Sequence, residues 1–189
     1  LFGLNGDTAS VVGDLTINLG GYVMVAGSFS VEKTILLNSD PEGKDEMVDL
    51  DLLRINLTGV DLLVGVGGTF IPGESGPPTI DTTEATGFAV SDANVSLAIA
   101  SVSGATDKRR WTGIAASADL LSVVGLPSDF TLDVTNLSVL FNQATGNDGA
   151  NPAADPVPIN WSALVDAGDP LNALAASTTL AVSGNLTVN

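Results

Sequence analysis

Two acidic loops carry the residue types in this sequence that could bind a metal ion. Calcium takes six to eight oxygen ligands, and loops rich in Asp, Asn and Gly supply them from carboxylates, amides and backbone carbonyls. The stretch NDGAN has this composition but lacks the alternating acidic positions and the final Glu of an EF-hand loop. The alternative is that both loops are solvated acidic turns. The candidate calcium ligands are Asn147, Asp148, Asn151 and Asp155, with Asp40, Asp45 and Asp49 as a second set.

Enzymatic chemistry has few candidate residues, because the sequence contains no histidine and no cysteine. These side chains are the commonest general base, transition-metal ligand and thiol nucleophile. The serines therefore have no histidine partner for a hydrolase triad. The glycine-rich run at residues 65–68 is followed by no lysine and no helix, which argues against a phosphate loop. We expect a protein that is not an enzyme and that has calcium as its one candidate cofactor.

The net charge of the chain limits the kinds of partner that it can bind. Asp and Glu outnumber Lys and Arg by 22 to 6, giving a net charge of −16. Such a surface repels nucleic acid and anionic membranes, and no apolar run reaches the roughly 18 residues of a membrane span. The basic run at residues 108–110 is predicted to be a solvated turn. The first ten residues lack the basic flank of a signal peptide, so we expect a piece of a larger or processed protein.

Alternating apolar residues predict β-strands along nearly the whole chain. In LLRINLTGVDLLVGVG, apolar residues alternate over 53–57, the phase slips by one residue, and alternation resumes over 60–66. The same slip separates 130–134 from 137–141 in FTLDVTNLSVLFN. Period-two alternation is typical of a half-buried strand, and a one-residue slip indicates a bulge that keeps the apolar residues on one face.

A short motif recurs at these bends: a small residue or Thr, then Asn, Asp or Gly, then an aliphatic residue. Its copies begin at residues 13, 58, 93, 118, 135 and 184. Asn, Asp and Gly suit a bend because they tolerate left-handed backbone angles. The first and last copies are nearly identical, since GDLTIN at 13–18 is echoed by GNLTVN at 184–189, an offset of 171 residues from Gly13 to Gly184. This offset indicates a repeat period.

These patterns predict one all-β unit over residues 1–189. We expect an elongated stack of bent strands resembling a β-solenoid rod, and a twisted antiparallel β-sandwich is the alternative. Turn-rich loops leave the strands at residues 38–51, 72–87 and 142–158. A short helix is expected between residues 161 and 176, broken around Gly168 and Pro170.

A family resemblance rests on stretches spread over nearly the whole chain. They are GDLTINLGGYVMVAGSFSVEKT before the first acidic loop, then ATGFAVSDANVSLAIAS, FTLDVTNLSVLFNQATG and the closing SGNLTVN. Together they resemble the tandem repeats of giant, adhesin-like surface proteins of aquatic bacteria. The resemblance implies an extracellular or cell-surface protein in which each unit is a spacer in a stalk or fibre.

The leading hypothesis is therefore a structural repeat unit of an extracellular filament or giant adhesin, whose partners are neighbouring copies of the same repeat. Adjoining units would continue the sheet across the junctions at residues 11–19 and 181–189 and so cover exposed strand edges. One alternative is a calcium-dependent module that binds a surface glycan or protein through loops 72–87 and 142–158. Another is a periplasmic β-groove that carries lipid, which predicts an open face of exposed aliphatic residues.

Overall fold

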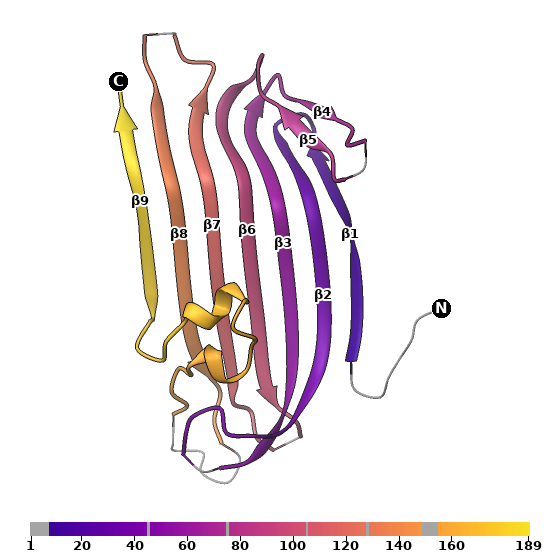
Figure 1. The fold of residues 1–189 in the computed structure, drawn as a ribbon, viewed down its shortest axis with the longest axis vertical. Helices are drawn as coiled ribbons and strands as arrows, with labels where there is room; N and C mark the ends of the chain where they lie inside the picture. Colours follow the sequence, from indigo (N-terminus) through magenta and orange to yellow (C-terminus); the bar gives the residue numbers. More distant parts are fainter. Residues whose placement is uncertain (1–7, 45, 75, 105, 128, 149–154) are drawn as a thin grey trace.

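The computed structural model describes residues 8–44, 46–74, 76–104, 106–127, 129–148 and 155–189. Seven long strands form one antiparallel sheet in the order β1-β2-β3-β6-β7-β8-β9, so each strand pairs with its neighbour along the chain (Figure 1). A two-stranded hairpin lies in the β3–β6 connection. The bounds of the long strands are β1 Thr8–Leu19, β2 Val23–Ser39, β3 Val48–Val66, β6 Thr86–Val102, β7 Arg110–Val124, β8 Leu132–Thr145 and β9 Leu180–Val188, and those of the hairpin are β4 Thr69–Ile71 and β5 Thr79–Asp81.

This architecture confirms the predicted all-β class. It confirms neither the solenoid-like rod nor the sandwich, because the described long strands pair as antiparallel neighbours in a single open sheet. Alternation along a strand indicates which residues share a face, but not whether a second layer covers that face. Among the described residues, no helix is long and apolar enough to cross a membrane.

The predicted phase slips are present as bulges. β3 carries one extra residue relative to β2, and β8 one extra relative to β9. At these bends the left-handed residues are Gly59 in β3 (φ 58°), Asp92 in β6 (φ 50°) and Asn136 in β8 (φ 53°). In β6 the left-handed residue is Asp92, two positions before Asn94, the Asn of the recurring motif. Asn94 is not left-handed itself, and its Oδ1 accepts a hydrogen bond from the Gly59 backbone N–H at 3.2 Å. The bulges thus form a row across neighbouring strands.

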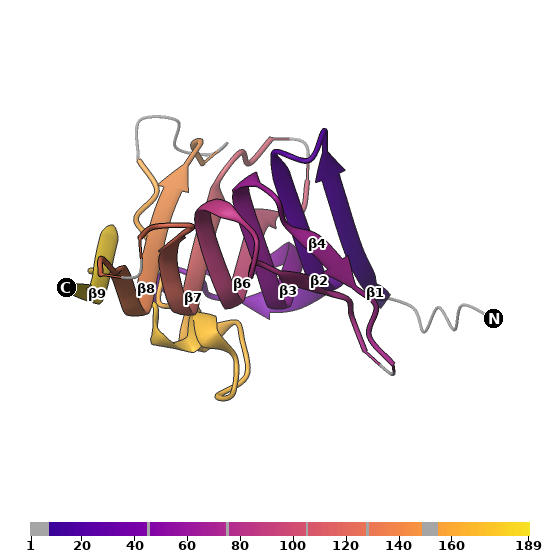
Figure 2. The same ribbon diagram turned by 90° about the horizontal axis from the view of Figure 1, so that it is seen from above.

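One face of the sheet, here called the covered face, is covered in two places by other parts of the chain (Figures 1 and 2). The connection between β8 and β9 packs on it with two short 3₁₀ helices, η1 (Trp161–Ala163) and η2 (Pro170–Ala173). They lie within residues 161–176, where a short helix broken around Gly168 and Pro170 is expected. The β4–β5 hairpin covers Met24 and Leu63 near the other end of the strands. The core beneath the β8–β9 connection consists of Leu50, Leu52, Ala98, Ala100, Trp111, Ala115, Ile159, Trp161, Leu171 and Leu174.

Buried polar bonds fix this connection to the sheet. The Trp161 indole N–H donates to the Asn142 Oδ1 at 3.1 Å, and the Asn142 amide donates to the backbone oxygens of Ile159 (2.8 Å) and Ala175 (3.0 Å). Gly113 lies under the Trp161 ring, where a Cβ would be 2.5 Å from the Cε2 atom. A side chain at this position would therefore hold the connection away from the strands.

Candidate assembly edges and open face

The other face of the sheet, here called the open face, is apolar from one edge to the other. Residues that are partners in an antiparallel ladder project their side chains to the same face. Three rows of paired residues cross all seven strands, and each row is made of aliphatic or aromatic residues or small Gly and Ala. The rows nearest the middle are Gly13-Phe29-Leu57-Val95-Ala116-Val139-Val182 and Val11-Val31-Ile55-Leu97-Ile114-Phe141-Leu180.

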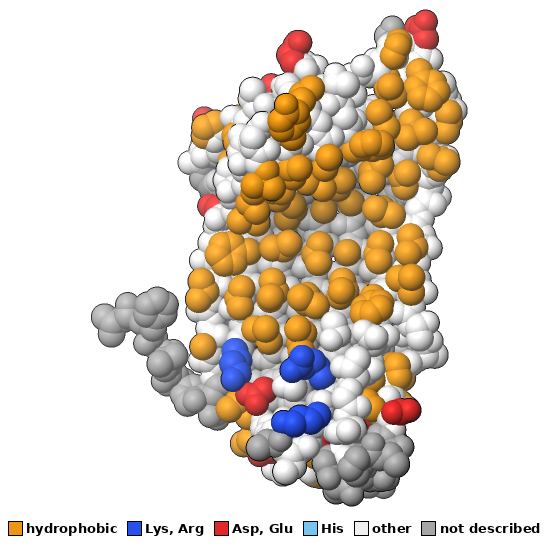
Figure 3. All heavy atoms as spheres, turned by 180° about the vertical axis from the view of Figure 1, so that it is seen from behind, with side chains coloured by type: hydrophobic (Ala, Val, Ile, Leu, Met, Phe, Trp, Pro, Cys, Tyr) orange, Lys and Arg blue, Asp and Glu red, His pale blue; other side chains and the backbone are white. Residues whose placement is uncertain are grey.

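No described element covers this face. Phe88 is 56% exposed on the central strand β6, and Val182 and Leu186 on β9 are 63% and 65% exposed. Figure 3 shows apolar side chains in successive rows, with no Lys, Arg, Asp or Glu in the middle of the face. Exposed apolar patches of this extent mark interaction sites.

The charges of the open face lie at one end of the strands. Lys33 and Asp51 form an ion pair there at 3.0 Å, with Arg110 lining the same shallow hollow. Hydrogen bonds from Lys33 and then Ser103 lower the pKa of Asp51 below its ordinary value. This end therefore stays ionised at neutral pH, while the rest of the face is uncharged.

The echoed sequence lies on the two edges of the sheet. Within the described residues, β1 pairs with β2 alone and β9 with β8 alone, so each has an outer side without a ladder partner. Residues 13–18 lie in β1, and residues 184–188 of the echo lie in β9. Unpaired strand edges are templates for pairing with another strand.

The two edge strands run in the same direction, and their equivalent side chains project to the same face of the sheet. β9 is the sixth strand after β1 in an antiparallel sheet, so both run the same way. Ile17 and Val188, which the 171-residue offset equates, both project from the open face, and so do Leu15 and Leu186. The equivalent glycines Gly13 and Gly184 lie on it too, where an added Cβ would be 3.1 Å from Phe29 and 3.0 Å from Val134.

The pairing also defines a stagger. The row that begins at Ile17 in β1 ends at Leu186 in β9, which the offset equates with Leu15. All three rows give the same result: each ends on β9 at the equivalent of the residue two positions earlier in β1. At about 3.4 Å per residue this is about 7 Å along the strand direction.

The predicted calcium ligands are partly outside the described residues, where Asn151 and Asp45 lie. Asp148 and Asp155 line a hollow of ≈ 180 Å³ together with Glu42, Glu46, Lys44 and Arg109. The Asn147 backbone oxygen accepts a hydrogen bond from Lys108 at 2.9 Å. No group of three or more carboxylates that could hold a metal ion occurs within the described part of the chain. Calcium binding remains a prediction.

The second predicted set shapes the β2–β3 turn. The Asp40 Oδ1 accepts a hydrogen bond from the Lys44 backbone N–H, and the Asp49 Oδ1 accepts one from the Asn38 backbone N–H, both at 3.0 Å. Asn38 is left-handed (φ 49°), so these carboxylates stabilise a tight turn.

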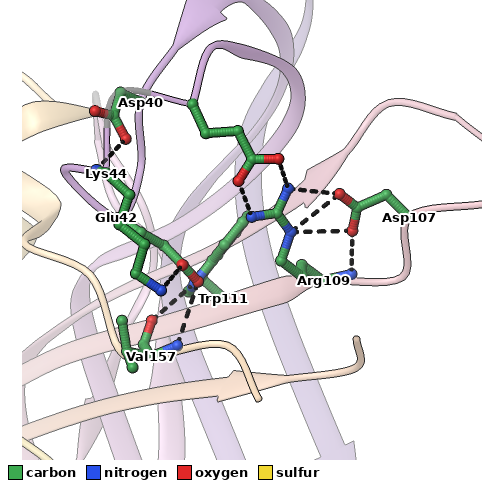
Figure 4. A network of polar contacts seen from close by, with 8 residues as sticks. Asp40, Glu42, Lys44, Asp107, Arg109, Trp111 and Val157 are labelled. Atoms are coloured by element: carbon green, nitrogen blue, oxygen red, sulfur yellow. Dashed lines mark hydrogen bonds and ion pairs between the residues drawn. The ribbon is translucent and has the colours of Figure 1, made fainter. Parts of the chain in front are cut away.

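Arg109 departs from the prediction of a solvated turn, because its side chain is 5% exposed. It donates to both Glu46 carboxylate oxygens (2.8 and 3.0 Å) and to both oxygens of Asp107, and lies 5.8 Å from the Trp111 ring centroid (Figure 4). Burial raises the pKa of Asp107, but hydrogen bonds and attraction from Arg109 outweigh it and lower that pKa. Arg109 thus ties the β2–β3 loop to the β6–β7 loop.

A polar depression of ≈ 630 Å³ occupies the middle of the covered face, and sequence reasoning did not foresee it. Asn56, Asn94 and Ser96 line it, and Arg54 forms ion pairs with Asp169 and Glu32 at its side. These residues occupy the polar positions of the alternation, which a sequence pattern assigns simply to solvent.

Comparisons of this chain with family models, curated proteins and solved structures find no match.

Proposed function

We propose that this chain is a structural unit that extends a β-sheet sideways, copy after copy, in a bacterial extracellular filament or surface stalk. The observation that carries the proposal is the position of the echo. The near-identical residues 13–18 and 184–189 fall on opposite edges of one sheet, run in the same direction and present the same apolar face. A unit whose last strand equals its first can be followed by another unit without a break in the sheet.

In this arrangement β9 also serves as the first strand of the next unit. Its inner side pairs with β8, as in the structure, and its outer side pairs with the β2 of the next copy, as β1 pairs with β2 here. The repeat is then six strands, about 29 Å at a strand spacing of about 4.8 Å. Pairing every edge removes the free templates for aggregation, and a continuous hydrogen-bonded ladder gives stiffness.

The test is a fusion in which residues 8–189 are followed directly by residues 19–189, so that the second copy has no β1 of its own. We expect the second β2 to be as protected from amide hydrogen exchange as the first, because residues 180–188 take the place of β1. The control is the same fusion with residues 180–189 replaced by a Gly/Ser linker of equal length, in which the second β2 should lose protection. Equal exchange of the second β2 in both fusions would refute the proposal.

A second candidate function is the carriage of lipid, which the exposed aliphatic residues of the open face favour. Solvent extraction of the natively purified protein, followed by mass spectrometry, tests it. Stoichiometric lipid would support a carrier and its absence would count against one.

A further inference from the structure

We propose that the open face is covered by a second copy of this chain, packed open face to open face, so that the filament is two sheets thick. The inference rests on the proposed function, because the sideways extension of the sheet determines how much apolar surface must be covered. It concerns a different surface, however: the rows of apolar side chains and not the strand edges.

The size of the face suits a protein partner. Seven strands spaced about 4.8 Å apart span about 29 Å, and the 12 residues of β1 span about 40 Å at about 3.4 Å each. The face thus offers on the order of 1,000 Å² to a partner. A stable protein interface buries about 800 Å² on each side, so one pair of faces is enough for a stable association.

Continuity of the face from unit to unit favours a second copy over other occupants. Leu15 and Ile17 on β1 and their equivalents on β9 project from the same face. Every unit added to the sheet therefore lengthens the same apolar surface, with the same stagger. A second sheet of the same units has the same period and matches that surface along its whole length.

The charge distribution also fits a self-association. Net charge of −16 makes two copies repel each other, but the middle of the open face carries no charged side chain (Figure 3). Lys33, Asp51 and Arg110 lie at one end of the strands. If the two sheets align with these ends together, the charged groups stay at the rim in water. The opposite alignment would bring Arg110 of one copy against the apolar end of the other, around Phe88, and bury it without a partner.

The shape of the face is less suited to lipid. Small-molecule sites are concave and bury most of the ligand surface. The hollow of ≈ 460 Å³ on this face lies at the charged end and is lined by Lys33, Asp51 and Arg110 beside Leu53 and Ile99. The apolar rows themselves are a broad surface of the kind that packs against another sheet about 10 Å away.

The first test compares Leu97→Glu, in the middle of the open face, with Ser117→Glu, an exposed residue on the covered face. Sedimentation velocity of the wild-type chain should show an even-numbered assembly. We expect Leu97→Glu to halve its mass, because the carboxylate would be buried between the sheets, and Ser117→Glu to leave it unchanged. Loss of mass in both variants, or in neither, overturns the proposal.

A second measurement does not depend on how well Leu97→Glu folds. The chain has no cysteine, so Ala116→Cys on the open face and its neighbour Ser117→Cys on the covered face each accept one spin label. We expect electron paramagnetic resonance to show an immobile label at 116 with dipolar coupling to the label of a second copy, and a mobile label at 117. A mobile label at 116 overturns the proposal.

The same label distinguishes coverage by lipid from coverage by a second copy. Lipid would immobilise the label at residue 116 without dipolar coupling to another label. The protein would then be a monomer from which lipid can be extracted. That result overturns the pairing of two copies. Neither outcome depends on the fusion test of the strand edges, so failure of the face and failure of the edges are separate results.

Discussion

Replacing Gly113 by Ala tests how the covered face is built. The new Cβ would lie 2.5 Å from the Trp161 Cε2 atom and 2.7 Å from its Nε1 atom, where carbon atoms in contact are normally about 3.5–4.0 Å apart. Trp161 is fully buried and held by the Asn142 side chain and by a backbone hydrogen bond from its own N–H to Leu174. The ring therefore cannot move without breaking these bonds or separating the β8–β9 connection from the sheet.

The expected cost follows from these contacts. Overpacking of a well-packed core costs about 1–3 kcal/mol. Loss of one hydrogen bond, if the ring rotates away from Asn142, adds about 1 kcal/mol. We therefore expect Gly113→Ala to lower the free energy of unfolding by about 2–4 kcal/mol. At a urea dependence of about 2 kcal/mol per molar, the denaturation midpoint should fall by about 1–2 M.

The assay is urea denaturation followed by tryptophan fluorescence, since Trp111 and Trp161 are both buried in this core. Gly168→Ala is the matched control, because it lies in the same connection and a Cβ there would meet nothing within 4 Å. We expect the control to change stability by less than about 1 kcal/mol. Equal midpoints for the two variants would refute the packing described for Trp161.

Two further predictions concern the acidic loops. Burial raises the pKa of Asp107, but its hydrogen bonds with Arg109 hold it below the ordinary 3.8, so the stability from this pair is present above about pH 4 and is lost as the pH falls through the lowered value. Thermal unfolding between about pH 2 and 6 should show a steeper loss at the acidic end for the wild type than for Asp107→Asn, and parallel curves would contradict this. Calcium at about 1 mM, the affinity range of extracellular modules, should raise the unfolding temperature of the wild type but not of the Asp148→Asn, Asp155→Asn double variant. Equal shifts in both proteins would show that these carboxylates are not the ligands.

Local features of the fold follow from the sequence, but the number of layers does not. The slips at residues 58–59 and 135–136 are visible as breaks in apolar alternation, and Pro170 marks the start of the second 3₁₀ helix. Alternation records the apolar face of each strand, not what packs against it. A single open sheet and a sandwich therefore have the same pattern.

Of the candidate functional features, the edge strands could be predicted from the sequence and the buried Arg109 could not. The echo of residues 13–18 locates both edge strands, because it is a property of the sequence itself. The burial of Arg109 depends instead on Glu46 and Asp107, which belong to two different loops. No spacing along the chain indicates that these loops meet, so a basic run that packs in a core has the same appearance as a solvated turn.

The bulges bear on the proposed sideways extension of the sheet, in which a unit with bent central strands would have to repeat. Along the row of bends, the pairing shows one extra residue in each of the four strands β3, β6, β7 and β8, and none in β1, β2 or β9; a separate extra residue in β2 lies near its end, between Leu36 and Ser39. The irregularity between Ala26 and Ser28 in the β2–β3 pairing introduces the bend, and the irregularity between β8 and β9 removes it. If β9 kept the extra residue, a following β2 would pair with it out of register, and a one-residue error moves every side chain to the opposite face. Because β9 returns to the unbulged form of β1, a next copy in the proposed filament would begin in register, and its apolar rows would continue on the open face.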